Sequence, residues 1–176
     1  MTREVRVVLI GLGHLGRRFC DLLSDKAGDL ADRYGLRLRL VGAADSRGMA
    51  YDPDGLDAGH ISALKQAGGS VAELPGVGRP SVALELIGQA EADLVCEASP
   101  VNLRQGAEPG LSHIRLALQR GMHVVTPNKG PLVLAYHELH ALAAQHGVQL
   151  RFDGTVAGGL PAVYLGQRDL RGSLVQ

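Results

Sequence analysis

The sequence predicts an α/β fold built on a doubly wound, mostly parallel sheet with helices on both faces. Short apolar segments rich in β-branched residues alternate with segments of helical periodicity along most of the 176 residues. The strand-like segments are continuously apolar, which is typical of parallel strands covered on both faces. The first of them runs through a glycine-rich turn into a helix, as at the start of a βαβ unit. The length suits one ordinary domain.

Strands and helices are expected in alternating order. Strands are expected at residues 5–10, 36–44, 93–98, 123–125 and 148–152. Helices are expected at residues 15–23, 61–66, 81–87 and 111–119, and a last one runs from Pro131 to Gly147. Pro131 suits the first position of a helix, and Gly147 suits its end. Residues 45–58, rich in Gly, Asp and Pro, are expected to form a loop.

Charge and composition exclude several classes of protein. Lys+Arg and Asp+Glu both number 18, so no charge excess points to nucleic acid or to a membrane surface. No apolar run approaches the roughly 20 residues that span a bilayer, and the N-terminus lacks a signal-peptide pattern. The two cysteines, Cys20 and Cys96, fall on a predicted helix and a predicted buried strand. A disulfide framework is therefore not expected, and the cytoplasm is the expected location.

A G-x-G-x-x-G motif joins the first predicted strand to the first predicted helix. Gly11 allows a tight turn, Gly13 lets the backbone approach a diphosphate, and Gly16 lets helix and strand pack closely. The N–H groups at the start of the helix, near His14 and Leu15, would meet the anion. We interpret the loop as a dinucleotide site in a Rossmann-like fold. The alternative is a glycine-rich turn that binds nothing.

Residues after the second predicted strand bear on the choice of dinucleotide. Asp45 closes the segment GAAD, where an acid that binds the ribose hydroxyls of NAD is expected. Ser46 and Arg47 follow directly, and an arginine there would suit the 2′-phosphate of NADP. Lys65 could supply a second positive group. NADP and NAD both remain open, and simple solvent exposure is the alternative for Arg47 and Lys65.

Lys129, one of three lysines in the chain, lies in the segment HVVTPNKGPL. Pro127 biases Thr126 toward an extended conformation, and Asn128 favours a turn, so the strand ends here. The turn therefore lies at the carboxyl end of a parallel strand, where open α/β sheets bind ligands. A partly desolvated lysine there is a candidate proton donor, although a solvated turn residue is the alternative. Residues 97–100 end another strand and should reach the same cleft.

Other catalytic patterns are weaker. Cys96 lies within an apolar run, where a buried structural thiol is expected rather than a nucleophile. His137 and His140 do not form the H-E-x-x-H zinc motif, and Glu138 does not complete it. A solvated helix face explains them better. The sequence contains neither a G-x-S-x-G elbow nor a P-loop.

Five segments taken in order resemble the N-terminal half of homoserine dehydrogenase. They are VVLIGLGHLGRRF, AADSRG, DLVCEASPVNL, GAEPGLSHIRLALQRGMHVVTPNKGPL and FDGTVAGGLP. The resemblance covers nearly the whole chain, and residues 106–132 are its most specific part. It implies NAD(P)-dependent interconversion of aspartate 4-semialdehyde and homoserine, in the pathway to threonine and methionine.

The resemblance also implies roles for individual residues. Lys129 matches the family's lysine in the proton-transfer and substrate site. Further cofactor contacts are implied for Gly11, Gly13 and Gly16 at the phosphates, for Ser46, Arg47 and Lys65 at the adenosine end, and for Ser99, Pro100 and Thr126 on the ring side. A monovalent cation is implied near Asp153, Val156 and Gly158, although the family usually has a glutamate at position 153.

Residues 1–152 are therefore expected to form an NAD(P)-binding domain, and residues 153–176 the start of a substrate domain that is otherwise absent. The leading hypothesis is homoserine dehydrogenase or its nucleotide-binding part, acting on a small-molecule substrate. A stand-alone dinucleotide-binding or regulatory module is the alternative. An aspartate dehydrogenase-like protein fits the block at 106–132 less well. Nucleic-acid and membrane partners are not expected, and a homo-oligomer remains open.

Overall fold

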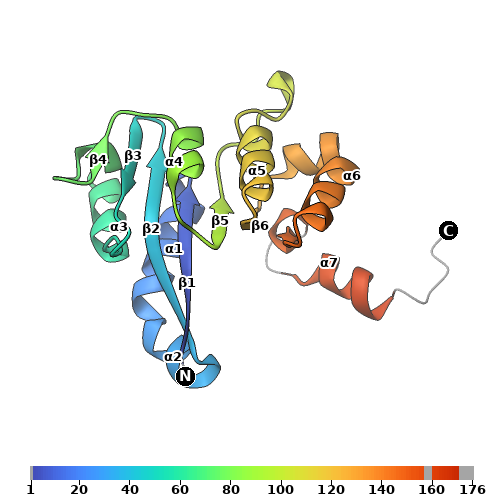
Figure 1. Cartoon of the computed structure of the whole chain (residues 1–176), viewed down its shortest axis with the longest axis horizontal. Helices are drawn as coiled ribbons and strands as arrows, with labels where there is room; N and C mark the ends of the chain where they lie inside the picture. Colours follow the sequence, from blue (N-terminus) through green and yellow to red (C-terminus); the bar gives the residue numbers. More distant parts are fainter. Residues whose placement is uncertain (1, 157–159, 171–176) are drawn as a thin grey trace.

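A computed structural model describes residues 2–156 and 160–170, and its centre is a seven-stranded sheet of order β4-β3-β2-β1-β5-β6-β7 (Figure 1). The strands are β1 (Arg3–Ile10), β2 (Leu36–Asp45), β3 (Gly48–Tyr51), β4 (Gly78–Arg79), β5 (Leu94–Glu97), β6 (His123–Val125) and β7 (Leu150–Arg151). β1, β2, β5, β6 and β7 pair in parallel, whereas β3 and β4 form an antiparallel edge. The predicted mostly parallel α/β sheet is confirmed.

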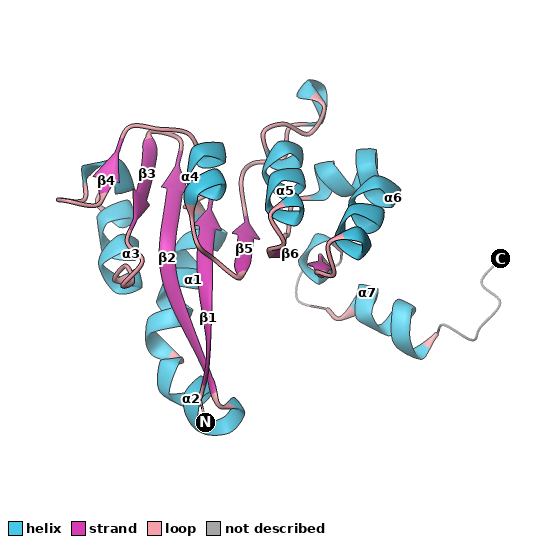
Figure 2. Cartoon of the chain, in the orientation of Figure 1, coloured by secondary structure: helices cyan, strands magenta, loops and turns pink. Residues whose placement is uncertain are grey.

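Helices cover both faces of this sheet, as Figure 2 shows. The helices of the described chain are α1 (His14–Asp25), α2 (Ala27–Tyr34), α3 (Ala58–Gln66), α4 (Ala83–Gln89), α5 (Gly110–Gln119), α6 (Lys129–Gln145) and the short α7 (Ala162–Tyr164), which extends away from the sheet (Figure 2). Successive β1 side chains enter two separate cores because side chains alternate across a strand. Val7 and Leu9 join the core under α1 and α3, whereas Val8 and Ile10 join the core under α4, α5 and α6. The fold is therefore doubly wound.

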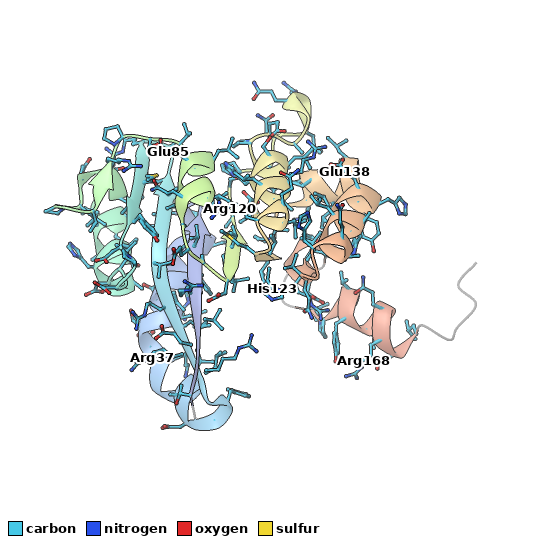
Figure 3. All side chains as sticks on the ribbon, viewed as in Figure 1. Arg37, Glu85, Arg120, His123, Glu138 and Arg168 are labelled. Carbon is cyan, nitrogen blue, oxygen red and sulfur yellow. The ribbon has the colours of Figure 1, made fainter. Side chains whose placement is uncertain are left out.

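Polar side chains tie together the helices of the second face. Arg115 of α5 forms an ion pair with Glu138 of α6, with Nη2 2.8 Å from Oε2. Arg120, just after α5, donates to the carbonyl of Ala90, just after α4, over 3.2 Å. Glu138 and Arg120 are labelled in Figure 3. The bonds help to hold α4, α5 and α6 in one layer.

The structure corrects the predicted loop at residues 45–58. β3 lies inside that range and pairs with the end of β2, Asp45 opposite Gly48. The Asp45 carboxylate accepts from the backbone N–H of Arg47 at 2.8 Å and of Gly48 at 3.2 Å, which closes a tight turn. The high Gly and Asp content thus indicated this turn and not a loop over the whole range. β3 has only four residues, which are too few to show the alternation of apolar and polar residues that marks a strand. α2 was not predicted either.

The start of the last long helix was also predicted wrongly. α6 begins at Lys129, and Asn128 caps it by accepting from the N–H of Gly130 at 3.2 Å. Pro131 is therefore the third helical residue rather than the first. Proline is tolerated there because the first N–H groups of a helix have no partner within the helix. The strand expected at residues 148–152 is reduced to the two residues of β7.

Neither cysteine is in a disulfide, and Cys20 is fully buried. Burial raises the pKa of both the Cys20 and the Cys96 thiol to about 12, which makes both poor nucleophiles. None of the described helices is long and apolar enough to cross a lipid bilayer.

Candidate functional site

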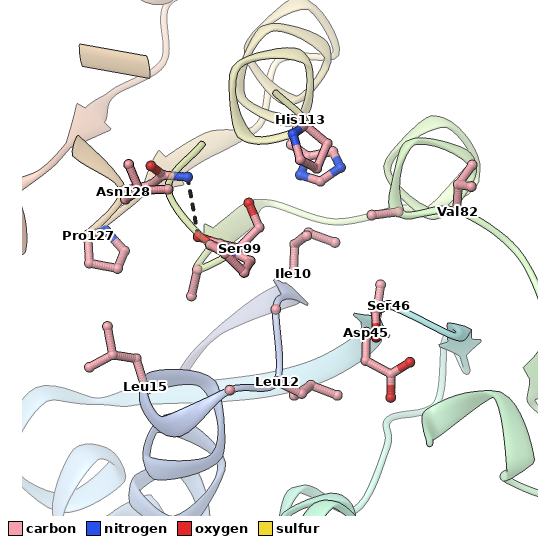
Figure 4. Close-up of a pocket in the computed structure, with 18 of the residues that line it drawn as sticks. Ile10, Leu12, Leu15, Asp45, Ser46, Val82, Ser99, His113, Pro127 and Asn128 are labelled. Atoms are coloured by element: carbon pink, nitrogen blue, oxygen red, sulfur yellow. Dashed lines mark hydrogen bonds between the residues drawn. The ribbon is translucent and has the colours of Figure 1, made fainter. Parts of the chain in front are cut away.

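A cavity of about 890 Å³ opens at the carboxyl ends of the central strands. β2 and β5 lie on opposite sides of β1, so this is the point where the winding of the sheet reverses. Such switch points are where open α/β sheets bind ligands. The wall of the cavity consists of residues 10–15, 44–46, 81–84, 98–101 and 127–129 with Lys65, Pro109 and His113 (Figure 4).

The three glycines of the loop between β1 and α1 differ in their surroundings. Gly11 has φ +92°, and an added Cβ would overlap the carbonyl of Ala98. A Cβ on Gly16, which lies outside the cavity wall, would overlap the carbonyl of Gly11. A Cβ on Gly13 would meet no heavy atom within 4 Å. The open space at Gly13 therefore lets a ligand come close to the backbone.

The first turn of α1 faces the same space. Gly13 is its N-cap and supplies no side-chain bond, and His14 and Leu15 are exposed on the cavity wall. Within the described residues, the first N–H groups of the helix thus have no side-chain acceptor, which leaves them available to an anion. These features fit the diphosphate of a dinucleotide.

Asp45 lies at the rim of the cavity, but its carboxylate serves the protein. Its side chain is only 5% exposed and accepts from Lys65 Nζ at 2.8 Å. Ser70 Oγ and the N–H of Val71 donate to it at 2.9 and 3.2 Å, in addition to the two N–H groups of the turn. Burial would raise the pKa of Asp45, but these bonds, led by Lys65, outweigh it and lower the pKa. Both carboxylate oxygens already accept hydrogen bonds from the protein. The interpretation of Asp45 as an acid that binds the ribose did not anticipate this.

The two basic residues at this end differ in position. Lys65 lines the cavity and also donates to the carbonyl of Gly69 at 2.8 Å. Arg47 does not line it, because its guanidinium donates to Gly68 at 2.7 Å and pairs with Glu73 at 3.3 Å. Ser46 is exposed on the cavity wall.

The opposite end of the cavity is organised by Glu97, the last residue of β5, which is 0% exposed. Its Oε1 accepts from the N–H of Ser99 at 3.0 Å and also from the Ser99 hydroxyl. Its Oε2 accepts from Thr126 Oγ1 at 3.2 Å. Ser99 and Pro100 line the cavity as expected of residues 97–100, whereas Thr126 is buried behind the wall. Glu97 thus joins the ends of β5 and β6.

His113 of α5 is a wall residue that the sequence patterns did not reveal. It is 4% exposed, and its Nδ1 lies 3.6 Å from Glu97 Oε1, slightly beyond hydrogen-bond length. Burial would raise the pKa of Glu97, but His113 and Ser99 outweigh it, so the pKa is lowered and the carboxylate stays ionised. Two features of the sequence could have indicated this pair: a histidine among the apolar residues of a predicted helix, and an acidic residue at the end of an apolar predicted strand.

Lys129 lines the cavity as the first residue of α6. It is exposed, and its ammonium has no hydrogen bond or ion pair to any residue within 2–156 or 160–170. The expected partial desolvation is therefore not provided by the described part of the chain. Asn128 beside it is 2% exposed and donates to the carbonyl of Ser99 at 3.3 Å, which fixes the turn against β5.

The residues predicted to hold a cation are only partly described. Asp153 Oδ1 is buried and has no hydrogen-bond partner in the described part of the chain, whereas Val156 is 47% exposed. Gly158 lies outside the described residues. Within those residues, no group of three His, Cys, Asp or Glu side chains could hold a metal ion, His137 and His140 included.

A doubly wound sheet with a glycine loop at its switch point defines the Rossmann-like class of nucleotide-binding domains. Within this class the chain belongs to the homoserine dehydrogenase family. Residues 11–153 match the family model described as "Homoserine dehydrogenase, NAD binding domain". The resemblance in the sequence is thereby confirmed.

Known relatives agree with this assignment. The chain is 35% identical over 167 residues to homoserine dehydrogenase from Methanocaldococcus jannaschii, covering 95% of this chain and 49% of that protein. It is 35% identical over 173 residues to the NAD(+)-dependent homoserine dehydrogenase of Pseudomonas canavaninivorans, covering 98% and 49%. The chain therefore spans about half the length of the curated relatives it matches.

Solved structures share the fold. A putative homoserine dehydrogenase from Archaeoglobus fulgidus superposes with a TM-score of 0.79 at 31% identity, over 94% of this chain and 47% of that one. A hyperthermophilic archaeal homoserine dehydrogenase in complex with NADPH gives the same TM-score of 0.79 at 21% identity, over 93% and 48%. At 21% identity the second match bears on the fold alone.

Proposed function

We propose that the chain is the cofactor-binding part of an NAD(P)-dependent oxidoreductase that interconverts L-aspartate 4-semialdehyde and L-homoserine. The observation that carries the proposal is one cavity with the glycine loop on one wall and the turn 127–129 on another. Residues 1–152 are its NAD(P)-binding domain, and residues 153–176 begin a substrate domain. The enzyme works in the cytoplasm in the pathway to threonine and methionine.

The two ends of the cavity bind different parts of the dinucleotide. The N–H groups that follow Gly13 bind the diphosphate, while Ser46 and Lys65 bind the adenosine end. Ser99 and Pro100 position the ring, and Thr126 acts behind them through Glu97. When bound, the dinucleotide supplies the hydride acceptor or donor. Lys129 holds the proton that the carbonyl oxygen takes up or releases.

The preference between NADP and NAD depends on Arg47. To reach a 2′-phosphate, its guanidinium must leave Gly68 and Glu73, and both are surface contacts of small energy. Among the relatives, one is named NAD(+)-dependent, whereas two solved structures of an archaeal homoserine dehydrogenase are complexes with NADPH. We expect Arg47→Ala to lower the affinity for NADPH and leave that for NADH within about twofold. An unchanged ratio of the two affinities would refute this role of Arg47.

Homoserine-dependent formation of NADPH or NADH tests the enzymatic proposal. The chain is assayed beside Lys129→Ala, which removes the proton donor, and beside Lys26→Ala, a change of an exposed lysine outside the cavity wall, at the C-terminal end of α1. Turnover that is lost only in Lys129→Ala supports the proposal. Equal turnover in all three proteins would remove Lys129 from the reaction.

A second function, a dinucleotide-binding or regulatory module without turnover, is favoured by the exposed and unpaired Lys129 of the described chain. Binding of NADPH or NADH without homoserine-dependent turnover would select it. A monovalent cation at Asp153, Val156 and Gly158 is a further part of the proposal, supported by the unpaired buried Asp153 oxygen. Exchange of K⁺ for a large organic cation tests it through the unfolding temperature.

A further inference from the structure

A buried polar pair lies at the cavity: His113 lines it, and Glu97 lies behind His113. The proposed reaction gives His113 no task. Glu97 is ionised and fully buried, and both of its oxygens are bonded to groups from the ends of β5 and β6. His113 is nearly as buried, yet its Nδ1 has no hydrogen-bond partner among residues 2–156 and 160–170. A buried imidazole without a bond costs stability, so this arrangement requires another explanation.

The two ring nitrogens of His113 have different surroundings. Nδ1 faces Glu97 Oε1 at 3.6 Å, and an ionised carboxylate there favours the tautomer with the proton on Nδ1. Nε2 is not among the buried unpaired atoms, and it bonds to no residue of the described chain. Since the residue lines the cavity, Nε2 is the nitrogen open to it. Figure 4 shows His113 beside this space, with Ser99 and Val82 on either side in the view.

The packing of α5 shows which end of the cavity His113 lies at. A Cβ on Gly110, one turn before His113, would collide with the amide of Asn128 and come within 3.3 Å of Ser99 Oγ. This face of α5 therefore rests on the ends of β5 and β6, together with Glu97. The adenosine-end groups, Ser46 and Lys65, come instead from the end of β2 and from α3.

We propose that His113 binds the cofactor directly, with Nε2 accepting a hydrogen bond from a hydroxyl of the ribose on the nicotinamide side. Glu97 is its positioning residue, because its carboxylate faces Nδ1 at 3.6 Å and is itself fixed by Ser99 and Thr126. The inference rests on the proposed binding of a dinucleotide. It adds a contact from α5 to those of the glycine loop and the turn 127–129.

The test compares a whole dinucleotide with a fragment that lacks the nicotinamide half. Binding of NADPH and of adenosine 2′,5′-bisphosphate is measured by calorimetry, or of NADH and AMP if the chain prefers NADH. His113→Asn keeps an amide nitrogen where Nδ1 stands but removes Nε2. We expect it to weaken the dinucleotide about 5–10-fold, as for one lost hydrogen bond, and to leave the fragment within about twofold.

His113→Gln is the matched control, because its amide oxygen can reach the place of Nε2 and accept the hydrogen bond from the ribose hydroxyl. Its amide can also supply the bond to the ribose, so we expect dinucleotide affinity within about threefold of the unsubstituted chain. Glu97→Gln should lower dinucleotide affinity selectively, since the ring loses the charge that orients it. Unfolding temperatures without ligand show that each variant is folded.

Four results would overturn the inference. They are unchanged dinucleotide affinity in His113→Asn, equal losses for dinucleotide and fragment, equal affinities of the Asn and Gln variants, and unfolding of both variants, which would make His113 a structural core residue. A failure of the proposed function looks different. In that case the unsubstituted chain itself binds neither NADPH nor NADH, and the inference falls with it.

Discussion

At the scale of single residues, the glycines of the loop make a direct contrast. An added methyl group at Gly16 would overlap the carbonyl of Gly11, whereas one at Gly13 would enter open space. We expect Gly16→Ala to lower the free energy of unfolding by about 2–3 kcal/mol, because the helix cannot approach the strand. Gly13→Ala should cost about 1 kcal/mol or less, since alanine is only a poorer N-cap.

The same two variants should rank in the opposite order for ligand binding. The methyl group of Gly13→Ala occupies space that we assign to the diphosphate, so NADPH affinity should fall at least about tenfold, or ~1.4 kcal/mol. Urea unfolding and calorimetric titration of both variants check the pair of expectations. Full cofactor affinity in a folded Gly13→Ala protein would contradict the diphosphate site.

Asp45 is expected to contribute to stability rather than to ribose binding. Its buried carboxylate bonds to Lys65, Ser70 and three backbone N–H groups, and Asn cannot accept all of them. Asp45→Asn should therefore lower the free energy of unfolding by about 2–3 kcal/mol at pH 7. Urea unfolding measures this change, and a loss below about 0.5 kcal/mol would contradict it.

The pH dependence of that stability has a definite sign. Because the folded pKa of Asp45 is lowered, its contribution is present above the ordinary value of about 3.9 and is lost as the pH falls through the folded pKa. The unsubstituted chain should lose stability below about pH 4 more steeply than Asp45→Asn does. Parallel acid titrations of the two proteins would exclude the linkage.

Asp45 also illustrates which features of the site could be predicted from the sequence and which could not. Its place at the end of a strand was predicted correctly, because a run of apolar residues ends there. The direction of its side chain was not, since Ser70 and Val71 approach it from 25 and 26 residues away. The same reason hid His113, which meets Glu97 only after α5 has packed on the sheet.

At the scale of elements, the start of α6 couples two strand ends. Asn128 caps α6 through Gly130 and donates to the carbonyl of Ser99 beyond β5. We expect Asn128→Ala to cost about 2 kcal/mol, from a lost cap and a lost buried hydrogen bond. Asn128→Ser keeps a cap acceptor and should cost about half as much.

Hydrogen exchange separates the two contributions of Asn128. The amide of Gly130 should exchange faster in Asn128→Ala than in Asn128→Ser, because only alanine leaves this N–H without an acceptor. Equal exchange rates in the two variants would mean that the side chain of Asn128 does not fix the first turn of α6.

Helices with a clear apolar periodicity and strands with a long apolar run could be predicted from the sequence. Short elements, and elements that form only against a partner strand or helix, could not. β1 and β5 are apolar runs ended by a turn, and α5 has an apolar stripe. β3 is four residues long and depends on its antiparallel partners, β2 and β4. α2 has no fully buried residue, and its apolar residues Ala27, Leu30, Ala31 and Tyr34 repeat over only eight residues, which is too short a pattern to indicate a helix by itself.

At the scale of the whole molecule, the cavity unites segments that lie more than a hundred residues apart, from the glycine loop to the turn 127–129. The resemblance assigned both segments to one family, which the family match over residues 11–153 confirms, and their common edge followed from the parallel sheet. The volume of the cavity and the residues behind its wall depend on how the helices pack. Those features could not be predicted from local patterns.

Because the cavity lies where the two halves of the sheet meet, ligand binding should stabilise the whole fold. A ligand present at 100 times its dissociation constant adds about 2.7 kcal/mol to a two-state protein. For a chain of this length, that corresponds to a rise in unfolding temperature of roughly 5–10 °C. Scanning calorimetry with NADPH and with NADH should show this rise for the preferred cofactor. A folded Gly13→Ala variant should show little rise at the same ligand concentration. A cofactor that binds in calorimetric titration but leaves the unfolding temperature unchanged would not be bound between the halves of the sheet.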